Sequence, residues 1–273
     1  ISKYKGENYT GKKVMSLDLF ESMLSKIPKE VQIIFSGYVE PWTNPECTDM
    51  LIHTLEEGYR VSVFTTLQGM SESDADWIIH TFNERYDQLN IMCIHLPDKD
   101  MHMRGWKNTP VYFDVLDKFF HFYNENGGIR FPKLQAMTMD KYGEPHPSIV
   151  ERYGLAQLSG GFTGWDRAGS LNVEKNKVDE SVMVSEVKNN FKNGCGATPS
   201  TYYNHQVLLP NGDLQICCMD YGLKNKLGNL NELESWEDVF NTPEYKRIDE
   251  LSNLAEYTDE LICKSCDQAC RIE

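Results

Sequence analysis

The sequence predicts an α/β fold in which a parallel sheet is followed by a small cysteine-rich unit. Segments typical of strands and of amphipathic helices alternate at least four times before residue 154. This alternation indicates βαβ units and a parallel sheet, open or closed. The later part of the chain differs, because six of the eight cysteines lie at or after Cys195. A chain of 273 residues is long enough for one large domain with such an appendage.

Most of the predicted elements have recognisable ends. An apolar stripe predicts a first helix at 15–27, where Ser16 supplies a cap and Pro28 stops the helix. Gly58 ends the second helix, because glycine readily adopts the left-handed conformation of a C-terminal cap. The expected strands are 31–35, 61–66, 90–96 and 134–139, and the expected helices are 15–27, 45–57, 74–86, 111–123 and 147–153.

The loops that follow the strands are where chemistry is expected, because ligands of parallel sheets bind beyond the C-terminal strand ends. After the first strand, Gly37 permits a sharp turn, Glu40 places a carboxylate at the sheet edge, and Pro41 fixes the backbone. This carboxylate could bind an ammonium group of a ligand or cap the following helix, and the sequence leaves both open. The second strand ends in two hydroxyl side chains, Thr65 and Thr66.

The third strand ends in two ionisable residues, His95 and Asp98. A single histidine or aspartate at a strand end is more often solvated or structurally hydrogen-bonded than catalytic. These two residues are therefore weaker candidates than Glu40.

The C-terminal cysteines indicate a metal or iron–sulfur site. Residues 205–216 read as a β-hairpin with a Pro-Asn-Gly-Asp turn, and Cys217 and Cys218 follow it directly. Cys263 and Cys266 form a C-x2-C pair, which supplies two thiolates from one tight turn. Spacing alone leaves zinc and iron–sulfur as alternatives and disfavours disulfides. The two cysteines that lie within predicted elements, Cys47 and Cys93, are expected to be buried apolar residues rather than ligands.

Composition excludes several classes of function. A formal net charge of -14 argues against nucleic acid as a partner, since non-specific affinity for the phosphate backbone comes from Lys and Arg. The sequence contains no apolar run of membrane-spanning length and no signal-peptide pattern, so no membrane partner is expected. Clustered cysteines without a secretory segment predict a reducing cytoplasm as the location.

The loop of Gly37 and Glu40 and the strand that follows resemble the core of the radical SAM enzymes. The run 35–41 is similar to the Gly-Gly-Glu-Pro-like loop after the family's second barrel strand. Thr65-Thr66 is similar to the Thr-Asn-like pair after the third strand, and 165–169 resembles the Asn-Arg-Ala-Gly stretch that many members carry. The resemblance implies a partial (β/α)6 radical SAM barrel, expected at 1–190.

The C-terminal part resembles the SPASM domain, or the shorter twitch domain, that is appended to many of these enzymes. The hallmark is a cysteine followed by Gly-x4-Cys, here Cys195, Gly212 and Cys217. A Leu-Gly-Asn-Leu run at 227–230 follows, then a helix that contains Trp236, and the closing C-x2-C pair. The resemblance implies an auxiliary cluster domain at 191–273 and favours iron–sulfur over zinc. Six cysteines are too few for a two-cluster SPASM domain, so one twitch-like cluster is expected.

Carried over by motif, the resemblance implies roles for individual residues. Glu40, with the backbone near Gly37 and Pro41, is expected to hold the amino group of S-adenosylmethionine, which Thr65 and Thr66 also approach. Asp98 or His95 is expected to reach the ribose, and Arg167 the methionine carboxylate. The expected ligands of the auxiliary 4Fe–4S cluster are Cys195, Cys217, Cys263 and Cys266, with Cys218 and Cys270 as possible substitutes.

One departure from the family pattern is large. The C-x3-C-x2-C loop, which holds the cluster that cleaves S-adenosylmethionine, does not occur in these 273 residues. Since the chain begins at Ile1 without an initiator Met, we expect this loop upstream of Ile1. A relative that has lost radical chemistry is the other interpretation.

If that loop is present, the resemblance implies an oxidoreductase that forms a 5'-deoxyadenosyl radical and removes a hydrogen atom from its substrate. The auxiliary cluster would accept the remaining electron, which makes the net reaction an oxidation. A small polyol or aminocyclitol is the expected substrate, and flavodoxin or ferredoxin the expected electron donor. The alternatives are a peptide-modifying enzyme with a peptide substrate and a non-catalytic iron–sulfur protein for electron transfer or partner binding.

Overall fold

The computed structural model describes residues 9, 11–103, 105–125, 133–138, 143–155, 205–252 and 258–266. It divides into two compact units, one made of residues 17–24 and 28–163 and the other of residues 1–16, 25–27 and 164–273. We call them the sheet unit and the cysteine unit and describe each by itself. The domain boundary predicted at 190/191 lies outside the described residues.

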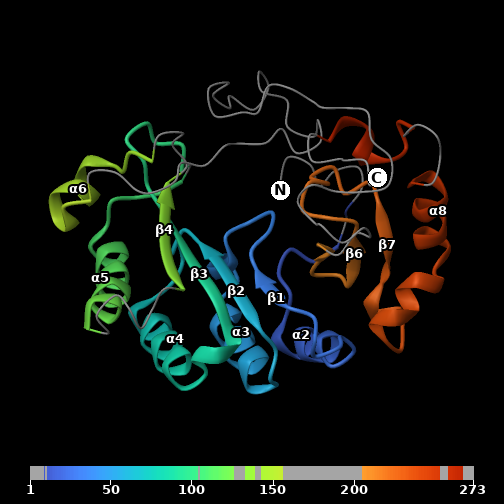
Figure 1. The fold of residues 1–273 in the computed structure, drawn as a ribbon, viewed down its shortest axis with the longest axis horizontal. Coiled ribbons are helices and arrows are strands. Elements are labelled where there is room, and N and C mark those ends of the chain that lie inside the picture. Colours follow the sequence, from blue (N-terminus) through green and yellow to red (C-terminus); the bar gives the residue numbers. More distant parts are fainter. Residues whose placement is uncertain are drawn as a thin grey trace. The chain divides into compact units, whose positions relative to one another are not determined.

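The sheet unit is built on a four-stranded sheet in the order β1-β2-β3-β4. All neighbouring strands are parallel, as the alternation of strands and helices predicted (Figure 1). Its strands are β1 (Ile33–Phe35), β2 (Val61–Thr65), β3 (Leu89–Leu96) and β4 (Leu134–Thr138). Because the strands follow chain order and run in one direction, their C-terminal ends and the loops after them share one edge.

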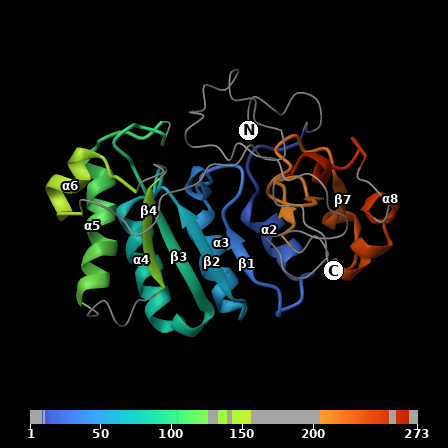
Figure 2. The ribbon, with the colours of Figure 1, turned by 45° about the horizontal axis from the view of Figure 1, so that its top comes forward.

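Helices connect the strands and cover one face of the sheet, as Figure 2 shows for α3, α4 and α5. Helix α2 packs against α3, α3 against α4, and α4 against α5. The helices of this unit are α2 (Leu17–Leu24), η1 (Pro41–Thr43), α3 (Cys47–Glu56), α4 (Glu72–Glu84), η2 (Tyr86–Gln88), α5 (Pro110–Glu125) and α6 (Pro147–Tyr153), where η marks a 3-10 helix.

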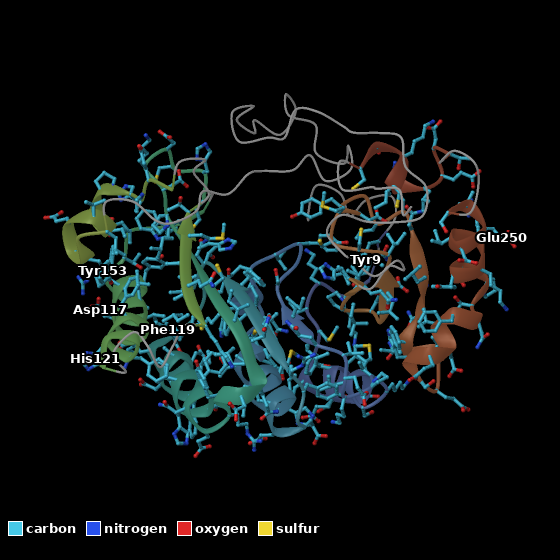
Figure 3. The ribbon with its side chains drawn as sticks, viewed as in Figure 1. Tyr9, Asp117, Phe119, His121, Tyr153 and Glu250 are labelled. Carbon is cyan, nitrogen blue, oxygen red and sulfur yellow. The ribbon has the colours of Figure 1, made fainter. Side chains whose placement is uncertain are left out.

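Local chemistry explains where the helix ends differ from the predicted ones. Helix α4 begins two residues earlier than expected, because Ser71 and Asp74 form a capping box. The positive φ of Gly58 (+90°) follows α3, in agreement with the predicted cap. Helix α6 packs on α5 through the hydroxyl of Tyr153, which donates to Asp117 at 2.6 Å; both side chains are labelled in Figure 3.

The two faces of the sheet differ in burial. The face under the helices carries apolar side chains with almost no exposure, among them Val63, Ile94 and Leu96. The other face carries less buried side chains, including Phe64 and His95, whose rings meet edge to face with centroids 6.4 Å apart. The main core of this unit therefore lies between sheet and helices.

The cysteine unit contains a three-stranded antiparallel sheet in the order β5-β6-β7. The predicted hairpin is β5 and β6, and the prediction missed the third strand. The segment of Trp236, predicted as part of a helix, is a 3-10 helix with a capping box formed by Ser235 and Asp238. The elements are β5 (Val207–Leu208), β6 (Asp213–Gln215), β7 (Lys226–Asn229), η4 (Leu230–Glu232), η5 (Trp236–Asn241), α8 (Pro243–Ser252) and η6 (Ile262–Ser265).

None of the helices in the described parts of the chain has the length and the apolar run that crossing a membrane requires.

Candidate functional site

The carboxylate of Glu40 lies at the C-terminal edge of the sheet, where side chains and backbone of the next strand bind it. Thr65 Oγ1 donates to Glu40 Oε1 at 2.5 Å. Thr66 donates to Glu40 Oε2 twice, from its backbone N–H and from its hydroxyl, both at 2.7 Å. The structure thus brings together three of the residues that the sequence singled out.

The alternative role of Glu40 as a helix cap does not hold. Glu40 occupies the N-cap position of η1, but its side chain makes no capping hydrogen bond. Its backbone carbonyl accepts instead from the N–H and the hydroxyl of Thr43, at 3.2 and 2.6 Å. The backbone therefore starts the turn, and the carboxylate is free to point toward the end of β2.

A strained turn after β2 orients the two threonine hydroxyls. Leu67 has a positive φ of 61°, a conformation that a residue with a side chain adopts at a cost of about 1–3 kcal/mol. Its N–H donates to Thr65 Oγ1 at 2.8 Å, which leaves the hydroxyl proton of Thr65 for Glu40. In the same way, Gln68 Nε2 donates to Thr66 Oγ1 at 3.2 Å. Each hydroxyl accepts one hydrogen bond and donates its own proton to the carboxylate.

The loops after β1 and β2 also approach closely at Gly69. Its φ is +91°, and a Cβ built there would lie 2.3 Å from the carbonyl oxygen of Trp42. Only glycine fits both constraints. Trp42 is anchored in turn, because its indole N–H donates to Thr48 Oγ1 at 3.0 Å.

The arrangement at Glu40 fits an ammonium group. A carboxylate offers about four lone-pair directions, and the threonines use three of them. A ligand N–H could use the remaining direction, in a charge-assisted hydrogen bond. Gly37 has a φ of +126°, and a Cβ added there would meet no atom within 4 Å, so the loop before Glu40 is uncrowded.

A thiol that the sequence did not connect with this site lies within the field of Glu40. Burial raises the pKa of Cys47, and the charges of Glu40 and Asp74 raise it further. Cys47 is 3% exposed. It is therefore a neutral, buried thiol, as expected of a residue that packs rather than binds metal. Cys93, also 3% exposed, is likewise buried in β3.

Asp98 is fully buried just beyond the end of β3. Its Oδ1 accepts from the N–H groups of Asp100 and His102 and lies 2.8 Å from His102 Nδ1. Its Oδ2 has no hydrogen-bond partner among the described residues. Asp98 also pairs with Pro145 in a β-bridge, which joins the loop after β3 to the loop after β4.

His95 lies inside β3, and its Nε2 is buried without a hydrogen-bond partner among the described residues. Burial lowers its pKa, because the charged imidazolium loses solvation. The expected contact of His95 or Asp98 with a ribose remains a prediction. Arg167 lies outside the described residues.

Four of the candidate cysteines gather in the cysteine unit. Cys266 is buried, while Cys217, Cys218 and Cys263 are partly accessible, and within the described residues none of the four is joined in a disulfide. Burial of the Cys217 thiol raises its pKa well above the usual value, and charges on the other three raise it further. These thiols are therefore near neighbours that cannot all ionise without a counter-charge. Cys195 and Cys270 lie outside the described residues.

A buried polar network joins the two cysteine turns. Asp220, fully buried, accepts from the N–H groups of Lys224 and Asn225 at 3.1 and 2.7 Å. The side chain of Asn225 reaches the other turn, where its Nδ2 donates to Glu260 O at 2.8 Å and its Oδ1 accepts from Ile262 N at 3.1 Å. The turn after Cys217 is thereby fixed to the backbone that leads into Cys263.

The donor set fits an iron–sulfur cluster, although the cysteines are not closed around a single ion. Among the described residues, no group of three His, Cys, Asp or Glu side chains is arranged to hold one metal ion. A cluster of several metal ions is wider than one ion, and its cysteine ligands stand farther apart. Bound metal also removes the penalty on ionised thiols, because it supplies the positive charge that they lack.

The Gly-x4-Cys motif has a structural reason. Gly212 has a φ of +89°, and a Cβ there would lie 2.6 Å from both Asn229 Oδ1 and Asn231 Nδ2. Both asparagines donate to the carbonyl of Asn211 at 3.1 Å. The Pro-Asn-Gly-Asp turn is therefore held by the strand and turn that contain the Leu-Gly-Asn-Leu run, and together they place the start of the cysteine turn.

Comparison with known protein families identifies the cysteine unit. Residues 195–267 match the SPASM family, described as an iron–sulfur cluster-binding domain. The match begins at Cys195 and includes the other three predicted ligands. Among curated proteins, none is significantly similar in sequence to the chain.

Comparison with solved structures identifies the fold. A crystal structure of BtrN in complex with AdoMet and 2-DOIA matches 95% of this chain and 80% of the BtrN chain, with a TM-score of 0.52 and 15% sequence identity. A selenomethionine structure of BtrN in an open conformation matches 92% of this chain and 79% of its own, with a TM-score of 0.49 and 13% identity. The first match confirms the predicted fold class over nearly the whole chain.

Proposed function

The chain has the fold of a radical SAM enzyme with a SPASM iron–sulfur domain at residues 195–267, and we propose that it binds S-adenosylmethionine through Glu40 and oxidises a small polyol. The single observation that carries this proposal is the carboxylate of Glu40, held by Thr65 and Thr66 at the C-terminal edge of a parallel sheet. A chain without a ligand at this edge has no need to fix a carboxylate with three donors.

The chain's own residues bind and orient in this proposal. Glu40 accepts a hydrogen bond from the ammonium group of S-adenosylmethionine, while Thr65 and Thr66 keep the carboxylate in place. The ribose hydrogen-bonds to Asp98 or to His95. Asp98 is buried, and one of its oxygens has no partner among the described residues. Because the protein's own donors hold the carboxylate, its orientation does not have to come from the ligand. The contact of Arg167 with the methionine carboxylate remains a prediction from sequence.

The cysteine ligands of the auxiliary 4Fe–4S cluster are proposed to be Cys195, Cys217, Cys263 and Cys266. Cys218 lies beside Cys217 and is the substitute within the described residues. A fully ligated cluster supplies one-electron chemistry and has no open site for substrate. This supports an oxidation, in which the substrate gives up one hydrogen atom, one further electron and one proton. Asn225 and Asp220 position two of the cysteine turns for that cluster.

The proposed reaction requires two further components. A second cluster, from a C-x3-C-x2-C motif that these 273 residues do not contain, is needed to cleave S-adenosylmethionine reductively. A low-potential donor such as flavodoxin or ferredoxin is needed to reduce it. The proposal of a polyol or aminocyclitol substrate is supported by the likeness in fold to BtrN, whose structure contains 2-DOIA.

The test replaces the carboxylate of Glu40 and measures binding of S-adenosylmethionine. Glu40→Gln keeps the shape of the side chain but removes its charge, so the dissociation constant should rise by about tenfold to a hundredfold, the worth of one charge-assisted hydrogen bond. The protein is prepared anaerobically from the start codon of its gene, and binding is measured by equilibrium dialysis with radiolabelled ligand.

Glu46→Gln is the matched control. Glu46 is another half-buried glutamate of the same unit, and its Oε2 accepts from Leu17 N at 3.2 Å, a hydrogen bond that glutamine retains. Glu46→Gln should bind S-adenosylmethionine like the wild type. Equal binding by the wild type and Glu40→Gln would contradict the proposal, and so would the absence of binding by the wild type. The second outcome would favour a non-catalytic iron–sulfur protein.

A further inference from the structure

Two aromatic side chains near the C-terminal edge of the sheet carry polar atoms that have no partner among the described residues. Trp106, in the loop after β3, is 7% exposed, and Tyr112, in the first turn of α5, is 6% exposed. Neither the indole Nε1 nor the phenol oxygen makes a hydrogen bond to any of the described residues. Buried polar groups are nearly always paired, because leaving one unpaired costs free energy. Two neighbouring exceptions therefore need an explanation.

The two polar atoms are close together and held by packing. The rings of Trp106 and Tyr112 meet edge to face, with centroids 5.7 Å apart. The indole also packs on the ring of His146 at 5.0 Å, and His146 N donates to Pro97 O at 2.8 Å. The loops after β3 and β4 thus support one side of the indole. The indole N–H approaches the phenol oxygen and lowers its pKa, as a hydrogen-bond donor does, but the two atoms do not reach the geometry of a hydrogen bond.

The pair belongs to the same edge of the sheet as Glu40. Burial raises the pKa of Tyr112 most, and the charges of Tyr153 and Glu40 raise it further, so the phenol lies within the field of the Glu40 carboxylate. It stays protonated and is a hydrogen-bond donor at neutral pH. The loop of Trp106 also contains Asp98, whose Oδ2 is a buried acceptor without a partner among the described residues.

We propose that Trp106 and Tyr112 form a two-donor site that binds a hydroxyl or carbonyl oxygen of the substrate. An indole N–H can only donate, and the phenol can donate at the same time, so the pair suits an oxygen with two lone pairs. This inference rests on the proposed function and specifies it, because it names the side chains that bind the oxygen of the substrate's alcohol group. An oxidised alcohol is bound equally well, since its carbonyl oxygen also accepts two hydrogen bonds.

The first test measures binding of two probes, myo-inositol and the aminocyclitol 2-deoxystreptamine. Isothermal titration is performed anaerobically on the cluster-loaded protein in the presence of S-adenosylmethionine. Tyr112→Phe, which removes only the hydroxyl, should weaken binding of the better probe by about tenfold, the worth of one buried hydrogen bond. Trp106→Phe should weaken it at least as much. Tyr153→Phe is the control, because its hydroxyl donates to Asp117 instead, and it should leave probe binding unchanged.

The second test uses stability and needs no probe. If the phenol awaits a substrate, Tyr112→Phe removes an unpaired polar group, and the Tm of the ligand-free protein should stay the same or rise by a few degrees. If a structural water or another permanent partner satisfies the phenol, the same variant should lower the Tm by about 2–4 °C. A lowered Tm would overturn the proposal.

The remaining outcomes separate this inference from the proposed function. If S-adenosylmethionine alone binds about tenfold more weakly to Tyr112→Phe, the pair holds the cosubstrate rather than the substrate, and the inference is wrong while the proposed function stands. If neither probe binds to the wild type although S-adenosylmethionine does, the proposed polyol substrate is wrong, and so is the inference about Trp106 and Tyr112. If S-adenosylmethionine does not bind to the wild type, the proposed function itself fails.

Discussion

The two candidate sites of this chain are held together in opposite ways. At Glu40, the protein supplies both the negative charge and the three donors that hold it. In the cysteine unit, the side chains gathered at the end of β6 and around η6 are thiols, and the charges of the other three oppose ionisation of Cys217. The first site is held by the protein's own groups, whereas the second needs metal to supply the missing positive charge. The sheet unit should therefore fold without its ligand, and the cysteine unit should depend on its cluster.

The largest expected effect is the loss of the auxiliary cluster from a single cysteine substitution. Cys266→Ser should abolish the iron and sulfide bound by the cysteine unit, because a serine hydroxyl is a poor ligand for iron and leaves one corner of the cluster open. Iron and sulfide per folded chain are measured after anaerobic reconstitution. Cys93→Ala, at an equally buried cysteine of the sheet unit, should keep the full amount. Retention of the cluster by Cys266→Ser would remove Cys266 from the ligand set.

The next effect tests how tightly the loops at Glu40 are packed. Gly69→Ala places a methyl group 2.3 Å from Trp42 O at a φ of +91°, so it should lower the free energy of unfolding by about 3 kcal/mol or more. Gly58→Ala has a similar φ of +90° but open space around it, and it should cost only about 1–2 kcal/mol. Urea denaturation of both variants measures the difference. Equal losses would mean that the two loops do not meet at Gly69.

A smaller effect is expected from the polar network of the cysteine unit. Asn225→Ala removes the side-chain hydrogen bonds to Glu260 O and Ile262 N, and it should destabilise the unit by about 2–3 kcal/mol. It should also speed the loss of iron to a chelator, which a merely local defect would not do. Asn231→Ala, which removes a hydrogen bond from an exposed side chain, should cost less than about 1 kcal/mol and leave iron release unchanged. Unchanged iron release in Asn225→Ala would contradict its positioning role.

The smallest effect is a dependence of stability on pH that comes from His95. Because burial lowers its folded-state pKa, the unfolded chain takes up a proton near pH 6.5, about the usual histidine pKa, while the folded chain does not. The contribution of His95 to the free energy of unfolding is therefore fully present above about pH 6.5. It is lost as the pH falls, by at most about 1.4 kcal/mol per pH unit.

Urea midpoints between about pH 5.5 and 7.5 measure this slope. His95→Gln should flatten it, whereas His80→Gln, at an exposed position beside Glu84, should change it little. A slope that His95→Gln leaves intact would assign the pH dependence to other groups.

Much of the fold could be predicted from sequence because local signals agreed with one another. Apolar periodicity, Pro28 and Gly58 located the helices and strands of the sheet unit to within a few residues. The capping box at Ser71 and Asp74 was missed because serine and aspartate are common in loops as well. The third strand of the cysteine unit was missed because Lys226–Asn229 is short and contains Gly228, which is unfavourable in strands.

Some residues of the candidate sites could likewise be chosen from sequence, and others could not. Glu40, Thr65 and Thr66 could be chosen from sequence because each ends a parallel strand or lies in the loop after one. Trp106 and Tyr112 could not, because their unpaired atoms come from packing between a loop and a helix that no local pattern encodes. Asn225 was also missed, since an asparagine that joins two distant cysteine turns is indistinguishable in sequence from one in an exposed turn. Burial and hydrogen bonding in three dimensions distinguish them.

The most direct test of the central claim is anaerobic iron and sulfide quantitation with EPR, on the protein expressed from the start codon of its gene. We predict two 4Fe–4S clusters per chain, one that Cys266→Ser removes and another whose reduced spectrum changes when S-adenosylmethionine is added. Zinc in place of iron, or an iron–sulfur spectrum that S-adenosylmethionine leaves unchanged, would contradict the claim that this chain is a radical SAM oxidoreductase.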